Sequence, residues 1–297
     1  MKKTLAMMTA AMMVAGALAG CGSSSSTPAA TTAAATEAAT TAAATEAATT
    51  EAAGDTTAAA EGTVKTPSGK FTVGFDQEFP PMGFVGDDGE FTGFDLDLAK
   101  EVASRLGLEF VPQPINWDAK DMELESGNID CIWNGFTMQD REDAYTWVGP
   151  YMANNQVFVV NADSDIASKA DLAGKAVEVQ KDSSGLAALQ DDAELSASFG
   201  SMTEVADYNT ALMDLESGAC DAVCMDSIVA GYQIKSSGKD MKILDDTLSA
   251  EEYGIGFKKG EDELAKAVYD TLMEMKDDGT VAKISNDWFG SDVFTLK

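Results

Sequence analysis

The folded part of the chain alternates between two hydrophobic periodicities. Apolar residues alternate with small or polar ones over 71–75, which predicts a strand. Over 94–106 apolar residues recur at helical spacing and Gly107 follows, which predicts a helix with a glycine stop. The segment 76–91 between them contains two prolines and three glycines, so we expect loop and turn there. The next predicted elements are a strand at 109–111, a helix from Asp118 to Ser126 and a strand at 129–133.

The second half of the folded part repeats this alternation. Two crossings between the halves, near 151–155 and 251–254, are expected to form a two-strand hinge. Strands that alternate with helices are typical of a parallel or mixed sheet covered by helices, so the predicted fold class is α/β. Strands are predicted at 156–160, 177–180, 221–225 and 253–257, and helices near Leu186 and at 210–216, 227–234, 261–277 and 280–288.

One short segment of the chain occurs twice. Residues 124–132 read Leu-Glu-Ser-Gly-Asn-Ile-Asp-Cys-Ile, and residues 215–223 read Leu-Glu-Ser-Gly-Ala-Cys-Asp-Ala-Val. Each copy predicts the end of a helix, a glycine stop and a buried strand. The repeat indicates two similar α/β lobes in one chain, with a chance match of composition as the alternative. Lobes of this kind often face each other across a ligand cleft.

The N-terminal part has the composition of a targeting segment and a linker. Lys2 and Lys3 precede an apolar run over 5–19, as in a secretory signal, and this run is short of the ~20 apolar residues of a membrane-spanning helix. The stretch 22–66, mostly Ala, Thr, Ser, Glu and Gly, cannot bury enough apolar surface to order itself, so a disordered tether is expected. The expected organisation is a signal peptide at 1–20, a tether at 21–66, a first lobe at 67–152 and 252–297, and a second lobe at 153–251.

Charge and residue usage narrow the function classes. The net charge of −30 argues against nucleic acid or anionic lipid as the main partner. The chain has no histidine, which removes Ser-His and Cys-His nucleophile pairs and the commonest metal ligand, so we expect neither a metal nor a cofactor. Cys220 and Cys224 are ~13 Å apart on a predicted strand, too far for a disulfide. Together with Cys131 they are expected to be free, mostly buried thiols.

Ligands of open α/β sheets bind beyond the carboxyl ends of the strands, so the residues that follow each predicted strand are the candidate contacts. The set suits a small zwitterion, since Arg141 can hold a carboxylate through a bidentate pair and Asp226 can accept from an ammonium. Backbone N–H groups near Thr137 and at the helix start by Ser183 can complete the carboxylate site. The candidates are Asp76, Phe79, Trp117, Asn134, Gly135, Thr137, Arg141, Gln180, Ser183, Ser184 and Asp226.

Several of these residues also have a purely structural interpretation. Trp133 lies inside a predicted strand and is expected to be core. Asp95 and Asp97 are expected to be a helix cap and a solvated first turn, without a ligand. The structural alternatives for the candidates are a surface ion pair for Arg141, a helix cap for Asp226, a turn for Asp76 and core packing for Trp117.

Eight short motifs carry a family resemblance. They are Phe-Pro-Pro-Met-Gly-Phe at 79–84, Gly-Phe-Asp-Leu-Asp-Leu-Ala at 93–99, Leu-Glu-Ser-Gly-Asn-Ile-Asp at 124–130, Gly-Phe-Thr at 135–137, Asp-Leu-Ala-Gly-Lys at 171–175, Asp-Ala-Val at 221–223, Asp-Gly-Thr at 278–280 and Trp-Phe-Gly at 288–290. In this order and spacing they resemble the extracytoplasmic solute-binding proteins of polar amino acid ABC importers, over about 68–291. The resemblance implies a type II periplasmic-binding-protein-like fold and a monomer that binds an amino acid, delivers it to a membrane permease and catalyses nothing.

The end of the signal region carries a second resemblance. Residues 18–21, Leu-Ala-Gly-Cys, resemble the lipobox of bacterial lipoproteins. This implies lipidation of Cys21 and an extracytoplasmic domain anchored to the outer face of the cell membrane, with an ordinary secreted protein as the alternative.

The family resemblance implies roles for the candidate residues. Arg141 would hold the α-carboxylate of the ligand, and Asp226 and Thr137 its α-ammonium. Two departures from the family pattern stand out: three residues rather than four separate Thr137 from Arg141, and the turn at 181–184 replaces one that usually contains glycine. Carboxylate-binding positions match Ser183 and Ser184, and side-chain-pocket positions match Asp76, Phe79, Trp117 and Gln180.

The expected function is therefore capture of an amino acid for import. Asp76 and Gln180 favour a polar or basic side chain held between Phe79 and Trp117, and an acidic ligand fits poorly because the pocket lacks a second cation. One alternative is an enzyme on the same scaffold, such as a cyclohexadienyl-type dehydratase. The absence of histidine and of an evident carboxylate pair disfavours it. The other alternative is a ligand-sensing surface receptor that does not transport.

Overall fold

The computed structural model describes residues 66 and 68–297. The expected signal peptide, Cys21 and nearly all of the tether lie outside the described residues. No helix in the described part has both the length and the apolar character that a membrane span requires.

The strands are β1 (Lys70–Phe75), β2 (Glu78–Phe79), β3 (Gly83–Val85), β4 (Phe91–Thr92), β5 (Glu109–Pro114), β6 (Cys131–Thr137), β7 (Thr146–Asn161), β8 (Ala176–Gln180), β9 (Ser201–Val205), β10 (Ala222–Asp226) and β11 (Met241–Phe257). The helices are α1 (Phe94–Leu106), α2 (Lys120–Glu125), α3 (Ser184–Asp191), α4 (Ala193–Ser198), α5 (Tyr208–Ser217), α6 (Ser227–Ser237), α7 (Asp262–Asp277) and α8 (Thr280–Phe289), with 3-10 turns η1 (Trp117–Ala119) and η2 (Lys169–Leu172).

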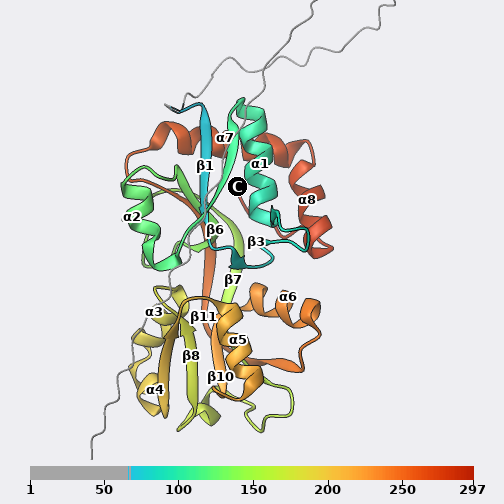
Figure 1. Cartoon of the computed structure of the whole chain (residues 1–297). Helices are drawn as coiled ribbons and strands as arrows, with labels where there is room; N and C mark the ends of the chain where they lie inside the picture. The colour runs from blue at the N-terminus through green and yellow to red at the C-terminus, as the bar shows by residue number, and fades with distance from the viewer. Residues whose placement is uncertain (1–65, 67) are drawn as a thin grey trace, which may run out of the picture. The chain divides into compact units, whose positions relative to one another are not determined.

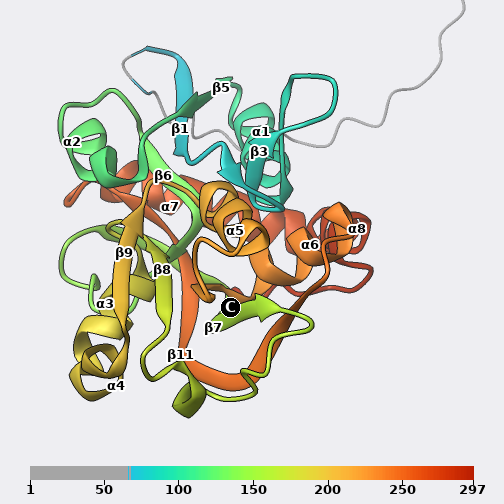
Figure 2. The same ribbon diagram turned by 60° about the horizontal axis from the view of Figure 1, so that its bottom comes forward.

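Eight of these strands form one mixed sheet in the order β5-β1-β6-β11-β7-β10-β8-β9. The strands β5, β1 and β6 are parallel at one end, and β10, β8 and β9 are parallel at the other. Between them, β7 and β11 pair antiparallel over 16 and 17 residues and belong to both halves (Figure 1). The helices α1, α2, α7 and α8 accompany the first half, and α3 to α6 the second (Figures 1 and 2). The α/β fold class, with two lobes joined by a two-strand hinge, is confirmed.

The repeated segment builds equivalent helix ends in the two halves. The helices α2 and α5 stop just before Gly127 and Gly218, whose φ angles are 75° and 77°. Glycine adopts this left-handed conformation without the steric penalty that a Cβ brings. In both copies the glycine N–H donates to the carbonyl of the repeat's leucine, at 3.1 Å. The turn that redirects the chain from helix to strand is therefore the same in each lobe.

The repeated aspartates also have the same role. The Asp130 carboxylate accepts the N–H of Thr72 on β1 at 2.7 Å, and the Asp221 carboxylate accepts the N–H of Ala176 on β8 at 2.8 Å. The backbone N–H of each aspartate returns a hydrogen bond to the carbonyl of the same partner residue, at 2.8 Å in both cases. Each aspartate therefore fixes its own strand beside the neighbouring parallel strand. This equivalence supports two related lobes over a chance match.

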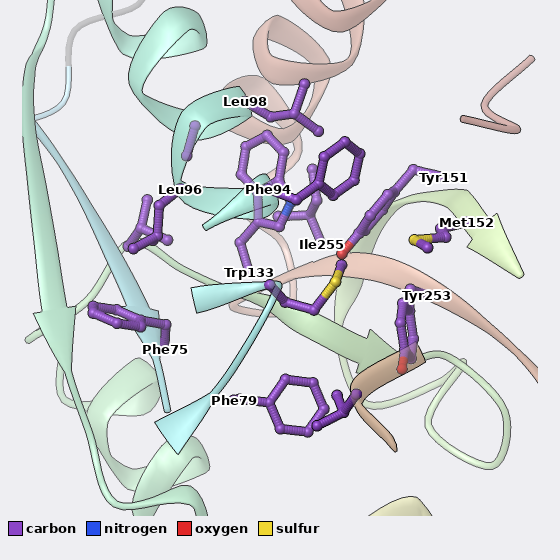
Figure 3. Packing of buried hydrophobic residues seen from close by; sticks show 14 of the residues in the cluster. Phe75, Phe79, Phe94, Leu96, Leu98, Trp133, Tyr151, Met152, Tyr253 and Ile255 are labelled. Atoms are coloured by element: carbon purple, nitrogen blue, oxygen red, sulfur yellow. The ribbon is translucent and has the colours of Figure 1, made fainter. Parts of the chain in front are cut away.

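The core of the first half lies between α1 and the sheet. Phe94 on α1, Trp133 on β6, Tyr151 on β7 and Ile255 on β11 are all fully buried and converge in Figure 3. Trp133 is therefore core, as predicted. The second half also contains an apolar cluster of its own, which includes residues of β8, β10 and α3. The three described cysteines are free and buried, which confirms that prediction.

Two local predictions were wrong, and one predicted strand is longer in the structure. The segment 76–91 is not loop throughout, because β2, β3 and β4 form a small antiparallel sheet. The strand β5 runs beyond Val111 to Pro114, which is tolerated because β5 is the edge strand and a proline there loses no ladder hydrogen bond. Asp118 caps no helix, since it lies in η1 and its carboxylate accepts from the Lys181 ammonium at 2.6 Å.

Candidate functional site

The carboxyl ends of β1, β6, β8 and β10 bring the candidate residues together. Nine of the eleven line one small cavity of about 10 Å³, roughly the space of one water molecule. Asp76 and Asn134 do not line this cavity but lie beside it, because the Asp76 carboxylate accepts from Gln180 Nε2 at 2.7 Å and the Asp76 N–H donates to Asn134 Oδ1 at 3.0 Å. The lining residues are Phe79, Trp117, Gly135, Thr137, Arg141, Gln180, Ser183, Ser184 and Asp226.

The end of β6 is shaped by Gly135. Its φ is 56°, and a Cβ at this position would lie 3.0 Å from the Phe79 ring and 3.1 Å from the Tyr253 ring. Its N–H donates to Asp95 Oδ2 at 2.7 Å, and the Tyr151 hydroxyl donates to the same oxygen at 2.7 Å. Glycine is required here for both conformation and space.

Asp95 does not lie in a solvated first turn. It is fully buried, and burial raises its pKa to about 7, while the hydrogen bonds from Tyr151 and Gly135 oppose the shift. It makes no cap hydrogen bond in α1, and Asp97 instead accepts from Trp288 Nε1 at 2.8 Å. Asp95 is a positioning residue for the cavity that helix-start reasoning missed, since a carboxylate in the first turn ordinarily faces water.

Arg141 follows Thr137 through a tight turn. Asp140 has a φ of 64°, and the Arg141 N–H donates to the Met138 carbonyl at 3.0 Å, which accommodates the shortened loop. The guanidinium donates to the Thr137 carbonyl at 3.2 Å and lies 5.1 Å from the centroid of the Phe136 ring. Within the described chain Arg141 forms no ion pair, so the surface ion-pair alternative is wrong.

The start of α3 contributes two serines with different roles. Ser183 is the N-cap, since its hydroxyl accepts from the Leu186 N–H at 3.1 Å and donates to the Gln180 carbonyl at 2.7 Å. Ser184 accepts from Thr137 Oγ1 at 3.1 Å, so its hydroxyl faces the end of β6. Asp182 has a φ of 56°, a left-handed conformation that aspartate tolerates better than most residues and that suits the glycine usual in this turn.

Asp226 lies at the end of β10 and is 3% exposed. Although it occupies the N-cap position of α6, its side chain makes no cap hydrogen bond. Its carboxylate instead accepts from Tyr253 OH at 2.6 Å, from Asn154 Nδ2 at 2.7 Å and from Tyr208 OH at 3.1 Å. Burial, reinforced by the nearby Glu251 carboxylate, raises the pKa of Asp226 well above its usual range.

The remaining candidates are Asp76, which lies beside the cavity, and Trp117, which lines it. Asp76 accepts from the Glu78 N–H at 2.9 Å through one oxygen and from Gln180 through the other, so it is both a turn residue and part of the site. It is 6% exposed, and burial raises its pKa to about 6. Trp117 is half-buried against Phe136, with ring centroids 5.6 Å apart, and borders the cavity, so it is not plain core.

Sequence reasoning missed several polar groups around Asp226. Asn154 and Glu251 lie within β7 and β11, and Tyr208 follows β9, a strand that the sequence analysis did not predict, so the rule that found the other residues passes over all three. Only the predicted hinge crossings pointed to the position of Asn154 and Glu251. Asn154 Nδ2 donates to both carboxylates, at 2.7 Å to Asp226 and 2.6 Å to Glu251. The sequence showed no evident carboxylate pair, and the structure contains one.

Comparison with known proteins gives relatives over most of the described chain. The L-cystine-binding protein TcyJ of Escherichia coli (strain K12) is 32% identical over 231 residues, which cover 76% of this chain and 84% of the relative. The arginine-binding extracellular protein ArtP of Bacillus subtilis (strain 168) is 30% identical over 241 residues, covering 78% of this chain and 92% of the relative. The crystal structure of an ABC uptake transporter substrate-binding protein from Streptococcus pneumoniae with bound histidine superposes with a TM-score of 0.75 at 34% identity, covering 77% of this chain and 96% of that one.

The family assignment follows from the extent of the match. The family model described as bacterial extracellular solute-binding proteins, family 3, matches residues 71–291, which include every strand of the eight-stranded sheet except the first residue of β1. The chain therefore belongs to family 3 of the bacterial extracellular solute-binding proteins.

Proposed function

We propose that the protein captures an amino acid outside the cell and delivers it to the permease of an ABC importer. The observation that carries this is one cavity with a cation and an acidic side chain on its lining. Arg141, without an ion-pair partner in the described chain, provides the cation, and Asp226 provides the carboxylate. A zwitterion places its carboxylate on the first and its ammonium on the second. Thr137, Ser184 and the N–H groups at the start of α3 surround the carboxylate position.

Binding requires the lobes to separate and close again. The cavity is too small for an amino acid, and residues from the two sides touch directly, as in the hydrogen bonds of Asp76 with Gln180 and of Thr137 with Ser184. Further contacts at the mouth include an ion pair between Lys120 and Asp182. The strands β7 and β11 are the connections that would bend, so hinge closure buries the ligand between the lobes. The lobe boundaries that fit this motion are 67–152 with 252–297, and 153–251.

The proposal includes lipidation of Cys21 and a location of the protein outside the cytoplasm. The Leu-Ala-Gly-Cys sequence at 18–21 supports a lipid anchor that holds the monomeric binding domain on the outer face of the cell membrane, after removal of the signal peptide at 1–20. The tether at 21–66 then links the anchor to the folded part. Labelling with a radioactive fatty acid and its loss in a Cys21→Ser variant test this step.

The ligand that the site favours has a basic side chain. Phe79 and Trp117 line the small cavity, and Trp117 and Asp76 line a larger one of about 820 Å³ with five further acidic side chains and one lysine. A cationic side chain that enters between the rings would meet this negative field and the Asp76 carboxylate. ArtP is named for arginine and TcyJ for L-cystine, so both ligands belong in the test.

A ligand screen tests the function. We expect L-arginine, L-lysine or L-ornithine to raise the melting temperature of the folded domain by about 5 °C or more at saturating concentration, because ligand at 100 times its Kd adds about 2.7 kcal/mol of stability. L-Glutamine and L-cystine form the next group to compare, and L-aspartate and L-glutamate are expected to have no effect. Absence of a response to all amino acids contradicts the proposal. Turnover of prephenate or arogenate would instead establish the dehydratase alternative.

Neutralising Asp76 tests the side-chain assignment. In Asp76→Asn we expect affinity for a basic ligand to fall about tenfold or more, since the pair between buried carboxylate and cation is lost, and affinity for L-glutamine to change less than about threefold. Isothermal titration calorimetry measures both. The matched control is Glu204→Gln, an exposed carboxylate at the rim of the same larger cavity. Equal losses for basic and neutral ligands would show that Asp76 does not select the side chain.

A further inference from the structure

Two acidic side chains lie together behind the ammonium end of the cavity. Asn154 Nδ2 donates to Asp226 Oδ1 at 2.7 Å and to Glu251 Oε1 at 2.6 Å, so a single amide nitrogen joins the two carboxyl groups. Both residues are almost completely buried, at 3% and 5% exposure. Gln156 Nε2 donates to the same Glu251 oxygen at 3.0 Å. All four side chains come from β7, β10 and β11, and β7 and β11 are the hinge strands.

No cation in the described part of the chain neutralises this pair. Neither carboxylate belongs to an ion pair there, and every hydrogen bond to Asp226 comes from a neutral group. Two buried carboxylates this close repel each other, and one responds by keeping its proton. An ammonium that enters the cavity removes this repulsion and takes the place of the proton.

The other titratable groups that face Asp226 do not compete for this role. They are Tyr208 on α5, Tyr253 on β11 and Cys224 on β10, and burial raises the pKa of each well above its ordinary value, so all three are neutral at pH 7. Among the residues that the structure describes, Arg141 is the only cation that lines the small cavity. Its place beside the Thr137 carbonyl assigns it to the carboxylate end of a ligand.

Glu251 borders a space that Asp226 does not border. It lines a second cavity of about 650 Å³, which shares Thr137, Arg141 and Ser184 with the small one. Asp140, Glu142, Asp191 and Asp192 also line this cavity. A proton leaving the buried pair can therefore reach water without crossing the ligand.

We propose that Glu251 is the second carboxyl group of the ammonium subsite, and that an arriving ligand ammonium displaces the proton held by Asp226. The inference rests on the proposed function. One O–H bond of the Asp226 carboxyl breaks, the proton passes to the solvent, and the ligand keeps its own protons. Ligand uptake at the hinge is thus coupled to proton release, and acidic surroundings weaken binding.

Calorimetric proton counting tests the inference. Binding of the ligand identified by the screen is measured at pH 7 in buffers of different ionisation enthalpy, and the heats yield the number of protons released. We expect roughly 0.5 to 1 proton per ligand, and an affinity that rises up to about tenfold per pH unit between pH 5.5 and 7.5. The pKa of Asp76 is raised to about 6, so Asp76 adds little to the number of protons released at pH 7. This small addition is the same in all variants compared.

Glu251→Gln is the decisive variant, with Glu252→Gln as its control. Glu252 is the neighbouring residue of β11 and is exposed, so the same chemical change there leaves the buried pair intact. We expect proton release below about 0.2 at pH 7 and an affinity that depends less steeply on pH in Glu251→Gln, with parental values in Glu252→Gln. Glu251→Asp keeps a carboxyl group and should give an intermediate count, which preserves the test if the glutamine variant does not fold.

The outcomes separate the inference from the function it rests on. Binding without proton release in the parent, or with unchanged release in Glu251→Gln, overturns the inference and leaves the proposed function standing. Failure of every amino acid to bind overturns both.

Discussion

Replacing Arg141 is expected to abolish useful ligand affinity while leaving the fold intact. In Arg141→Ala an amino acid carboxylate loses a bidentate, charge-assisted partner in a buried place, a loss of about 3 kcal/mol or more and thus at least about 100-fold in Kd. Arg141→Lys keeps the charge but not the planar fork of donors, so we expect about 10- to 100-fold weaker binding. Calorimetric titration gives the Kd values.

Stability distinguishes this effect from unfolding. Arg141 makes a hydrogen bond to the Thr137 carbonyl and a cation–π contact with Phe136, so its removal should change the free energy of unfolding by about 1 kcal/mol or less. The matched control is Arg105→Lys at the only other arginine of the chain, which pairs with Glu101 on its own helix and with Asp278. Parental affinity in Arg141→Ala would remove Arg141 from the site and with it the assignment of the two ends of the ligand.

Much of the fold could be predicted because its signals are local. The helix at 94–106 has the bounds that its periodicity and Gly107 indicate. The repeat predicted two equivalent lobes, and the paired roles of Asp130 and Asp221 explain why the aspartate recurs at the same place. The three short strands between Glu78 and Thr92 could not be predicted, since two or three residues are too few to show a period.

The residues of the candidate site also differ in whether local sequence signals predict them. The residues beyond strand ends were predictable because the carboxyl ends of the strands meet at one place, and nine of eleven line the cavity there. Asp95 and Glu251 were not, since each is a carboxylate whose burial depends on partners distant in sequence. Asp95 is enclosed by Tyr151 and Gly135, and Glu251 by Asn154 and Gln156. Neither partner set follows from local spacing.

The same burial predicts that the ligand-free protein becomes more stable when Asp226 loses its ability to ionise. The folded state holds the Asp226 proton to a higher pH than the unfolded chain does, because burial and Glu251 raise its pKa. Folding therefore takes up a proton between about pH 4 and that raised pKa. The free energy of unfolding falls as the pH rises through this window, by up to about 1.4 kcal/mol per pH unit. Asp95 and Asp76, with pKa values raised to about 7 and about 6, add slopes of the same sign.

Asp226→Asn separates the contribution of Asp226 from the other two. The amide has the shape of the protonated carboxyl group and, like it, offers a donor on one side and an acceptor on the other, so parent and variant should be about equally stable at pH 4.5. At pH 8 the variant should be more stable by about 2 kcal/mol or more, because only the parent must hold a buried charge beside Glu251. Urea denaturation at both pH values measures the difference, and Asp270→Asn on the exposed face of α7 should show no such change.

Asp226→Asn should at the same time lose at least about 100-fold in affinity for an amino acid, since the ligand's ammonium no longer meets a carboxylate at the end of β10. A pH dependence of stability as steep in Asp226→Asn as in the parent would show that the proton is held elsewhere. If the variant gains stability and loses binding, the buried carboxylate pair serves ligand binding and lowers the free energy of unfolding of the ligand-free protein.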